Sequence, residues 1–357
     1  WDQDRRQTLE QRADGLHSMV YQKKLGTLFD KQERVATLAA TIAEQIGGNA
    51  AHAERAARLC KCDLLTSMVH EFPELQGIMG RYYAANDGEP DSVSTAIEEH
   101  YRPRFAGDDL PISHEGQALA IADRLDSLVG IFAIGQQPTG VKDPFALRRA
   151  ALGVVRLCIE KELDVDLEVL LNIAAAGFDK SLDASSATGT VISYVMDRLR
   201  AYYQDSGIRV DLIDAVLATR PTRLLDVDRR LQACQVFRKL PEAESLAAAN
   251  KRIANILKKT DQRIPDQVDN GRLVDKAEKQ LARQLEKIST VVVPLMDAGD
   301  YTPALKQLAG LRKNVDAFFD QVMVMAEDDS LRANRLALLQ NLSKLFLRVA
   351  DLSRLQS

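Results

Sequence analysis

Apolar residues recur three and four positions apart along most of the chain, which is the spacing of one helix face. The clearest case covers residues 33–46, and Gly47-Gly48 follow it as a stop signal. A second case predicts a helix over about residues 50–69. The first stripe consists of Val35, Leu38, Ala39, Ile42 and Ile46. This pattern predicts an all-α protein.

The same spacing predicts helices along the rest of the chain. Asp143-Pro144 is a strong start signal, because Asp caps helices and Pro fits their first turn. Ser330, with two acidic residues before it, is the predicted cap of the last helix. The helix after Asp143 carries Leu147, Ala151, Val154, Val155 and Cys158 on its inner face. The other predicted helices cover about residues 113–129, 191–204, 209–219, 245–259, 273–290, 303–312, 314–326 and 330–350, with one more starting near 226 and loops at 102–111, 174–190 and 260–271.

Composition agrees with this fold class. With 357 residues but only 11 prolines, 19 glycines and 5% aromatic residues, the chain suits two or three helical domains better than a β-sandwich. No run of about 18 apolar residues exists, which excludes a membrane-spanning helix. The four cysteines match no zinc pattern and are expected to be reduced, buried thiols of a cytoplasmic protein. Because the first residue is Trp1 and not Met, we expect a piece of a longer protein.

Common catalytic signatures are missing from the sequence. It contains no Walker loop, no G-x-G-x-x-G loop and no G-x-S-x-G elbow. The five histidines form no H-E-x-x-H pair, and Pro73 interrupts the helix that His70-Glu71 would need. The sequence therefore predicts no catalytic centre.

One near match concerns a metal site. The helix over 33–46, the turn at Cys62-Asp63 and residues 122–126 resemble the HD superfamily of metal-dependent phosphohydrolases. In that family a His, a His-Asp doublet and a later Asp hold a divalent metal that activates water. Here the doublet has Cys62 in place of His, and residues 31–34, where the first His is expected, read Lys-Gln-Glu-Arg.

The resemblance implies a degenerate HD-like domain that binds no metal. Neutral nitrogen ligands are what such sites mostly use, and they are missing here. Asp63 and Asp123 are then expected to form structural hydrogen bonds or a salt bridge, for example to Arg58 or Arg124. A working metal-dependent phosphohydrolase remains the alternative.

Basic residues gather in a few places although the net charge is −4. The helix over 245–259 has a row of cations and amides opposite its apolar face, which suits a phosphate backbone; the alternative is a solvated face. That polar row consists of Lys251, Arg252, Asn255, Lys258 and Lys259. Further clusters are Arg102 with Arg104, Lys142 with Arg148 and Arg149, and Arg220 with Arg223, Arg229 and Arg230. Binding needs a local basic face rather than a basic average, so nucleic acid is not excluded.

Arg335 falls on the apolar stripe of the last predicted helix. A buried guanidinium requires a partner, because an unpaired buried charge is costly. We expect a carboxylate of a neighbouring helix, and an RNA phosphate is the alternative.

Two stretches resemble the DALR-type anticodon-binding domain known from arginyl-tRNA synthetase. Residues 247–257, AAANKRIANIL, look like its opening helix. Residues 322–326, VMVMA, and 331–339, LRANRLALL, look like its final helices.

A more specific resemblance runs through the whole chain, to the β subunits of bacterial glycyl-tRNA synthetases. It is carried by KLGTL at 24–28, ELQGIMGRYY at 74–83, RPRFAGDDLP at 102–111, DPFALRRAALG at 143–153 and AFFDQVMVM at 317–325. The resemblance implies the tail of an upstream region at 1–20, an HD-like helical domain at 21–165, a helical connector at 166–240 and a DALR-type helical bundle at 241–357.

The family also implies partners. Its enzymes are hetero-oligomeric ligases in which the α subunit uses glycine and ATP with Mg at a class II site, and the β subunit recognises tRNA. We therefore expect tRNA-Gly and an α subunit as partners, no DNA, no membrane, and no cofactor or catalytic residue in this chain. An assembly scaffold that holds α subunits without touching RNA is a further alternative.

Within this interpretation the basic clusters become candidate tRNA contacts. The candidates for the anticodon are Asn250, Lys251, Arg252 and Asn255, and those for the tRNA body are Arg102, Arg104, Lys142, Arg148 and Arg149. Arg220, Arg223 and Lys258 are further candidates.

Overall fold

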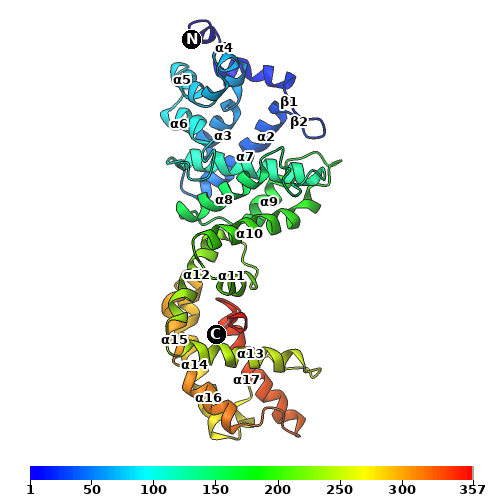
Figure 1. Cartoon of the computed structure of the whole chain (residues 1–357), viewed down its shortest axis with the longest axis vertical. Coiled ribbons are helices and arrows are strands. Elements are labelled where there is room, and N and C mark those ends of the chain that lie inside the picture. Colours follow the sequence, from blue (N-terminus) through cyan, green and yellow to red (C-terminus); the bar gives the residue numbers. More distant parts are fainter. Residues whose placement is uncertain (356–357) are drawn as a thin grey trace. The chain divides into compact units, whose positions relative to one another are not determined.

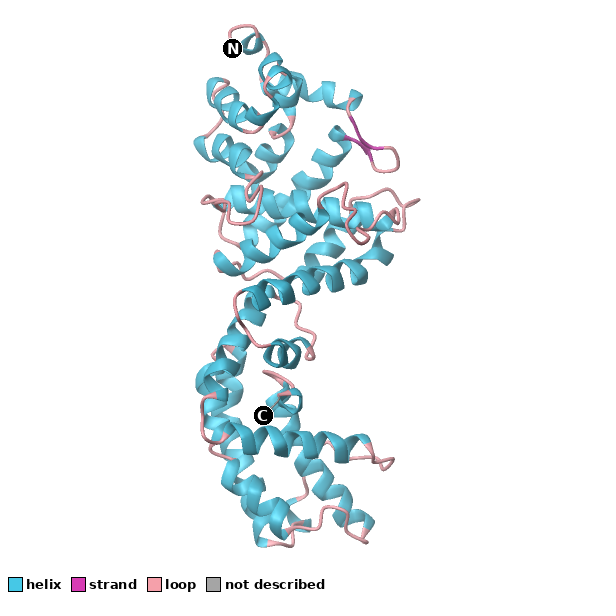
Figure 2. Ribbon diagram, viewed as in Figure 1, coloured by secondary structure: helices cyan, strands magenta, loops and turns pink. Residues whose placement is uncertain are grey.

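The computed structural model describes residues 1–355, and within them helices dominate (Figure 1). The only sheet that Figure 2 shows in the described chain is a small antiparallel pair, β1 (Val20–Gln22) with β2 (Gly26–Thr27). The all-α prediction is confirmed. The helices are α1 (Leu9–Arg12), α2 (Leu28–Gln45), α3 (Ala50–Leu59), α4 (Ser67–Glu71), α5 (Ile78–Asn86), α6 (Asp91–Glu99), α7 (His114–Ala133), α8 (Leu147–Glu160), α9 (Leu167–Ala176), α10 (Thr188–Asp205), α11 (Val210–Leu217), α12 (Leu224–Arg238), α13 (Ala243–Lys258), α14 (Lys276–Asp297), α15 (Tyr301–Ala309), α16 (Arg312–Gln321) and α17 (Asp329–Leu347).

The chain forms two compact units. Unit 1 comprises residues 1–202 and 222–225, and unit 2 comprises residues 203–221 and the chain from Asp226 on. The segment 166–240, predicted as a connector, is divided between them: α9 belongs to unit 1 and α11 to unit 2. The domain boundaries expected near 165 and 240 stay predictions.

Helix α7 is the central helix of unit 1. It is buried almost all round from Gly116 to Phe132, and α2, α3, α6, α8 and α9 pack against it. A helix that is apolar on all sides has to be covered by other helices on all sides. Helix α2 has the expected inner face, and its first turn is fixed by a capping box in which Thr27 and Asp30 bond to each other's backbone.

Several local predictions were wrong. The helix expected over 314–326 ends at Gln321. The helix expected over 50–69 ends at Leu59; a 3-10 turn over Cys62–Leu65 follows, and Thr66 caps the short α4. Helix α8 begins at Leu147, because Ala146 has a left-handed backbone (φ 54°), although Asp143 does accept bonds from the first helical N–H groups. Asp328, rather than Ser330, caps α17.

The prediction that the cysteines are reduced and buried is confirmed. All four thiols are free and buried. No helix in the described part of the chain is long and apolar enough to cross a membrane.

Unit 2 is organised around a buried ion pair. Arg335 on α17 is 4% exposed, and its Nε lies 2.5 Å from Glu278 Oε1 of α14 while its guanidinium also contacts Asp275, 2.6 Å away. It donates a further bond to the Met323 carbonyl, 2.7 Å away. The carboxylate partner expected for Arg335 is confirmed, and it joins α17 to the first turn of α14.

Replacing Arg335 with Met should destabilise unit 2 strongly. The change leaves Glu278, which is fully buried, with an unpaired charge, and breaking a buried pair costs about 3–5 kcal/mol. Chemical denaturation followed by circular dichroism measures the loss. Arg272→Ala is the matched control, since its pair with Asp269 is more than half exposed and is worth at most about 1 kcal/mol. Equal effects of the two changes would contradict a structural role for Arg335.

Candidate nucleic-acid interface

Two of the degenerate HD positions are occupied by structural bonds. Asp63 is fully buried, and its Oδ2 accepts bonds from the backbone N–H groups of Gly77 (2.6 Å) and Gly80 (3.2 Å) at the start of α5. Cys62 is also buried, and burial raises the pKa of its thiol to about 12. Its Sγ donates to the Arg58 carbonyl at 3.6 Å.

The third position, Asp123, pairs with a lysine. Lys31 of α2 is 4% exposed, and its Nζ lies 3.2 Å from Asp123 Oδ1 and 3.0 Å from Asp126 Oδ2, both on α7. The partners expected for Asp123, Arg58 or Arg124, were wrong: Arg58 pairs with glutamates and Arg124 bonds to carbonyls. The cation that balances Asp123 thus belongs to the protein.

The ion pair between Lys31 and Asp123 shifts the pKa values of both groups. Burial alone would raise the pKa of Asp123, but the ammonium groups of Lys31 and Lys61 outweigh it and hold that pKa well below its usual range. Burial would likewise lower the pKa of Lys31, and the carboxylates of Asp123 and Asp126 reverse this and raise it. Both groups are therefore charged at neutral pH.

A second buried lysine lies beside them. Lys61, just before the doublet position, has its Nζ 2.7 Å from His100 Nε2 and packs over the Tyr101 ring. His100 Nδ1 is 2.7 Å from the Ile97 carbonyl, so the ring donates there and accepts from Lys61. Burial and then Lys61 keep the pKa of His100 well below its usual value. These partners were not predicted, because nothing along the chain links residues 61 and 100.

No group of three or more His, Cys, Asp or Glu side chains within residues 1–355 has a geometry that could hold a metal ion. The acidic groups at the HD positions accept bonds from ammonium and amide groups instead. The arrangement can hold helices together.

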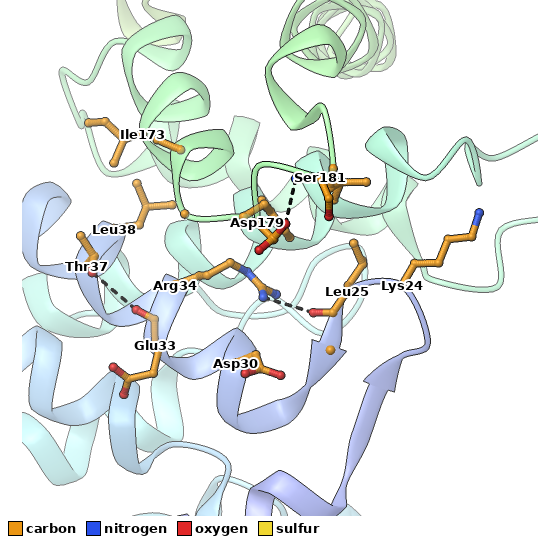
Figure 3. A pocket seen from close by; sticks show the side chains of 15 residues that line it. Lys24, Leu25, Asp30, Glu33, Arg34, Thr37, Leu38, Ile173, Asp179 and Ser181 are labelled. Carbon is orange, nitrogen blue, oxygen red and sulfur yellow. Dashed lines mark hydrogen bonds between the residues drawn. The ribbon is translucent and has the colours of Figure 1, made fainter.

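A hollow of unit 1 lies between α2 and α9 (Figure 3). It encloses about 800 Å³ and has side chains of both charges on its wall, among them Lys24, Asp30, Arg34 and Asp179. Arg34 bonds to the Leu25 carbonyl at 3.2 Å and to Asp126, and its guanidinium stacks on Phe178. The guanidinium of Arg34, the main cation of this hollow, is therefore already neutralised by Asp126. The hollow thus has no net preference for an anion.

The predicted cations before and on α8 come together in space. Arg149 donates to the Arg104 carbonyl at 2.9 Å, and Arg148 donates to the Gly140 carbonyl. Two loops, 102–108 and 139–142, are thereby held at the first turn of α8. Arg102 pairs with Glu98 (2.8 Å) and Arg104 with Asp108 (3.0 Å), whereas Lys142 is exposed. We call these two loops and the first turn of α8 the α8 loop cluster.

Arg220 and Arg223 have separate surroundings. Arg220 is exposed and has a left-handed backbone (φ 53°). Arg223 lies in unit 1 and pairs with Asp164 at 2.8 Å.

Helix α13 carries the predicted polar face. Lys251, Arg252, Asn255 and Lys258 are all exposed, and Arg252 stacks over the Phe319 ring of α16 at 4.3 Å. Asn250 is a correction: it is 6% exposed, and its Nδ2 donates to the Leu246 carbonyl at 2.9 Å. Asn250 lies four residues after Leu246 and three residues before Ile253, which places it on the apolar face of the helix. The sequence therefore already contained the signal that this side chain is buried.

Comparison with known proteins defines the class of chain. A sequence model of the DALR anticodon binding domain matches residues 246–352, which contain most of α13 and all of α17. The C-terminal part of the chain is thus a member of a class of anticodon-binding helical domains.

The N-terminal part of the chain identifies the family. The glycyl-tRNA synthetase beta subunit model matches residues 1–218. Proteins named glycine–tRNA ligase beta subunit are 54% identical in Marinobacter nauticus, 53% in Chromohalobacter salexigens and 51% in Pseudoalteromonas translucida, over 99–100% of this chain. The chain belongs to the glycyl-tRNA synthetase β-subunit family. It spans about half the length of these relatives, 51–52%.

Replacing Lys31 with Met should destabilise unit 1 in a pH-dependent way. Because the folded-state pKa of Asp123 is depressed, its contribution to stability is present above the unfolded pKa of about 3.9 and is lost as the pH falls below that value. The variant lacks this contribution. We expect a deficit of about 3–5 kcal/mol near pH 7 that narrows toward pH 3, measured by denaturation at a series of pH values.

Lys24→Met is a matched control, because Lys24 is exposed. It should change stability by less than about 0.5 kcal/mol at any pH. A Lys31→Met deficit that is the same from pH 7 to pH 3 would refute the ion-pair account.

Proposed function

We propose that this chain is the tRNA-binding part of the β subunit of a heteromeric glycyl-tRNA synthetase. In this proposal it recognises and positions tRNA-Gly for ATP-dependent glycylation in the cytoplasm. Glycine and ATP with Mg act at the α subunit, and this chain contributes no catalytic residue. The observation that carries the proposal is the row of exposed cations on α13, inside the segment that matches the anticodon-binding domain.

The chemistry of this face supports RNA as the ligand. Exposed lysines bind phosphate as point charges, and an exposed Asn has the donors and acceptors to read a base edge. Lys251 and Lys258 are two turns apart on α13, and no ion pair within residues 1–355 involves either. They are therefore available to a polyanion, whereas buried Arg335 has its carboxylates already.

The metal-dependent phosphohydrolase is the weaker alternative. Lysines balance the acidic residues that would serve as ligands, so a bound divalent ion would have to displace an ammonium group. Metal analysis after dialysis against Mn²⁺ or Zn²⁺ tests it, and we expect neither stoichiometric metal nor a rise in the thermal midpoint. A bound ion with phosphatase activity would favour the hydrolase.

Replacing Lys251 and Lys258 together with Ala should weaken tRNA-Gly binding. Each lost phosphate contact removes about 0.7–0.9 from the slope of log affinity against log salt, so the slope should fall by about 1.5. Anisotropy titrations of labelled tRNA-Gly at several salt concentrations measure both quantities. Stability should change by less than about 0.5 kcal/mol, since both side chains are exposed.

The control is Lys279→Ala with Lys287→Ala, which removes the same charge from exposed positions of α14 in the same unit. If this control weakens binding as much as the α13 variant, the effect is one of net charge. If neither variant binds less well than the parent, the α13 face is only solvated. If the parent itself binds no tRNA at any salt concentration, the assembly scaffold becomes the better interpretation.

A further inference from the structure

The loop before α7 is held by arginines. Arg124 of α7 is 8% exposed, and it donates to the carbonyls of four consecutive loop residues, 100–103, at 2.9–3.3 Å. Burial lowers the pKa of Arg124 to about 10, and the group still carries its charge at neutral pH. Gly153 of α8 makes room for this side chain, since a Cβ there would lie 2.6 Å from the Arg124 Nε.

Two arginines of α8 hold the rest of the same loop. Arg149 donates to the Arg104 carbonyl at 2.9 Å, and Arg156 donates to the Asp108 carbonyl at 3.1 Å. Asp108, itself 7% exposed, accepts bonds from the Arg104 N–H at 2.7 Å and Nε at 3.0 Å. Backbone and side chains are thus ordered before any ligand arrives, which lowers the entropic cost of binding.

This ordered loop presents an aromatic ring to solvent. The Asp108 N–H bonds back to the Phe105 carbonyl at 3.2 Å, and Gly107 completes the turn with φ +83° and open space where a Cβ would stand. Phe105 is 58% exposed at the start of this turn. An exposed aromatic side chain on a loop that is held by hydrogen bonds is available to contact a ligand.

The charges around Phe105 indicate the kind of ligand. Lys142, Arg148 and Arg149 form no ion pair within residues 1–355, and they lie in the same α8 loop cluster. Against them Asp109 is the exposed carboxylate of the loop, since Asp108 is neutralised by Arg104. An aromatic ring with cations around it is how proteins contact unpaired nucleotides, by stacking a base and binding its phosphates.

We propose that Phe105 stacks on an unpaired nucleobase of the bound tRNA, and that the cations of the α8 loop cluster contact the neighbouring phosphates. Arg124 is then a positioning residue that fixes the loop. The proposal rests on the proposed function, because it names a contact within the same complex. In this proposal salt does not screen the stacking contact of the Phe105 ring. Salt does weaken the contacts between the cations and the phosphates.

The test compares Phe105→Ala with Phe105→Trp in anisotropy titrations against tRNA-Gly and against an RNA duplex without unpaired nucleotides. Loss of one stacked base should lower tRNA affinity about 5- to 150-fold, leave the salt slope unchanged, and leave duplex binding unchanged. Phe105→Trp should restore most of the affinity. Phe72→Ala, which removes an exposed ring (47%) elsewhere in unit 1, should have no effect. Thermal midpoints of all variants should match the parent.

The outcomes separate the two proposals. If the parent chain binds tRNA and Phe105→Ala binds it equally well, the stacking contact is wrong and the proposed function stands. If Phe105→Ala instead loses copurification with the α subunit while its tRNA affinity is unchanged, the loop is a protein interface and the proposal is overturned. If the parent binds no tRNA at any salt concentration, both proposals fail.

Discussion

The ammonium group of Lys31, enclosed between Asp123 and Asp126, joins α2 to α7, and unit 1 is built around these two helices. A buried ammonium costs several kcal/mol of lost hydration, and only close carboxylates offset it. The ion pairs of this side chain therefore add to the packing that holds α2 against α7. Asp126 also binds Arg34, which extends the link to the turn at Leu25.

The same constraint recurs wherever a basic side chain is buried. Lys61 bonds to His100, Arg124 to a row of loop carbonyls, and Arg335 to the carboxylates of α14. Each of these cations is satisfied within the protein. The cations of α13 and some of those in the α8 loop cluster are exposed instead. A net charge of −4 does not distinguish the two groups, since it sums paired interior charges with free exterior ones.

The acidic residues at the predicted metal positions bind groups of the protein itself. Asp63 accepts two amide bonds at the start of α5, and Asp123 meets the ammonium group of Lys31. These bonds hold the turn at residues 62–65 against α5 and α7 against α2.

The sequence by itself determined the helical class, the inner faces of most helices, the family, and the need of Arg335 for a carboxylate, because periodicity and local capping are encoded within a few residues. It was wrong where local signals conflict with packing: the helix expected over 50–69 breaks at Cys60-Lys61, where Lys61 turns inward to reach His100. Only the tertiary structure decided which cations are paired and which are free. Lys31 pairs with Asp123, and Arg124 bonds to the loop at 100–103. These partners are too far apart in the sequence for a local pattern to predict them. Burial and pairing are properties of the packed chain, and they separate the arginines and lysines that hold this protein together from those that face outward.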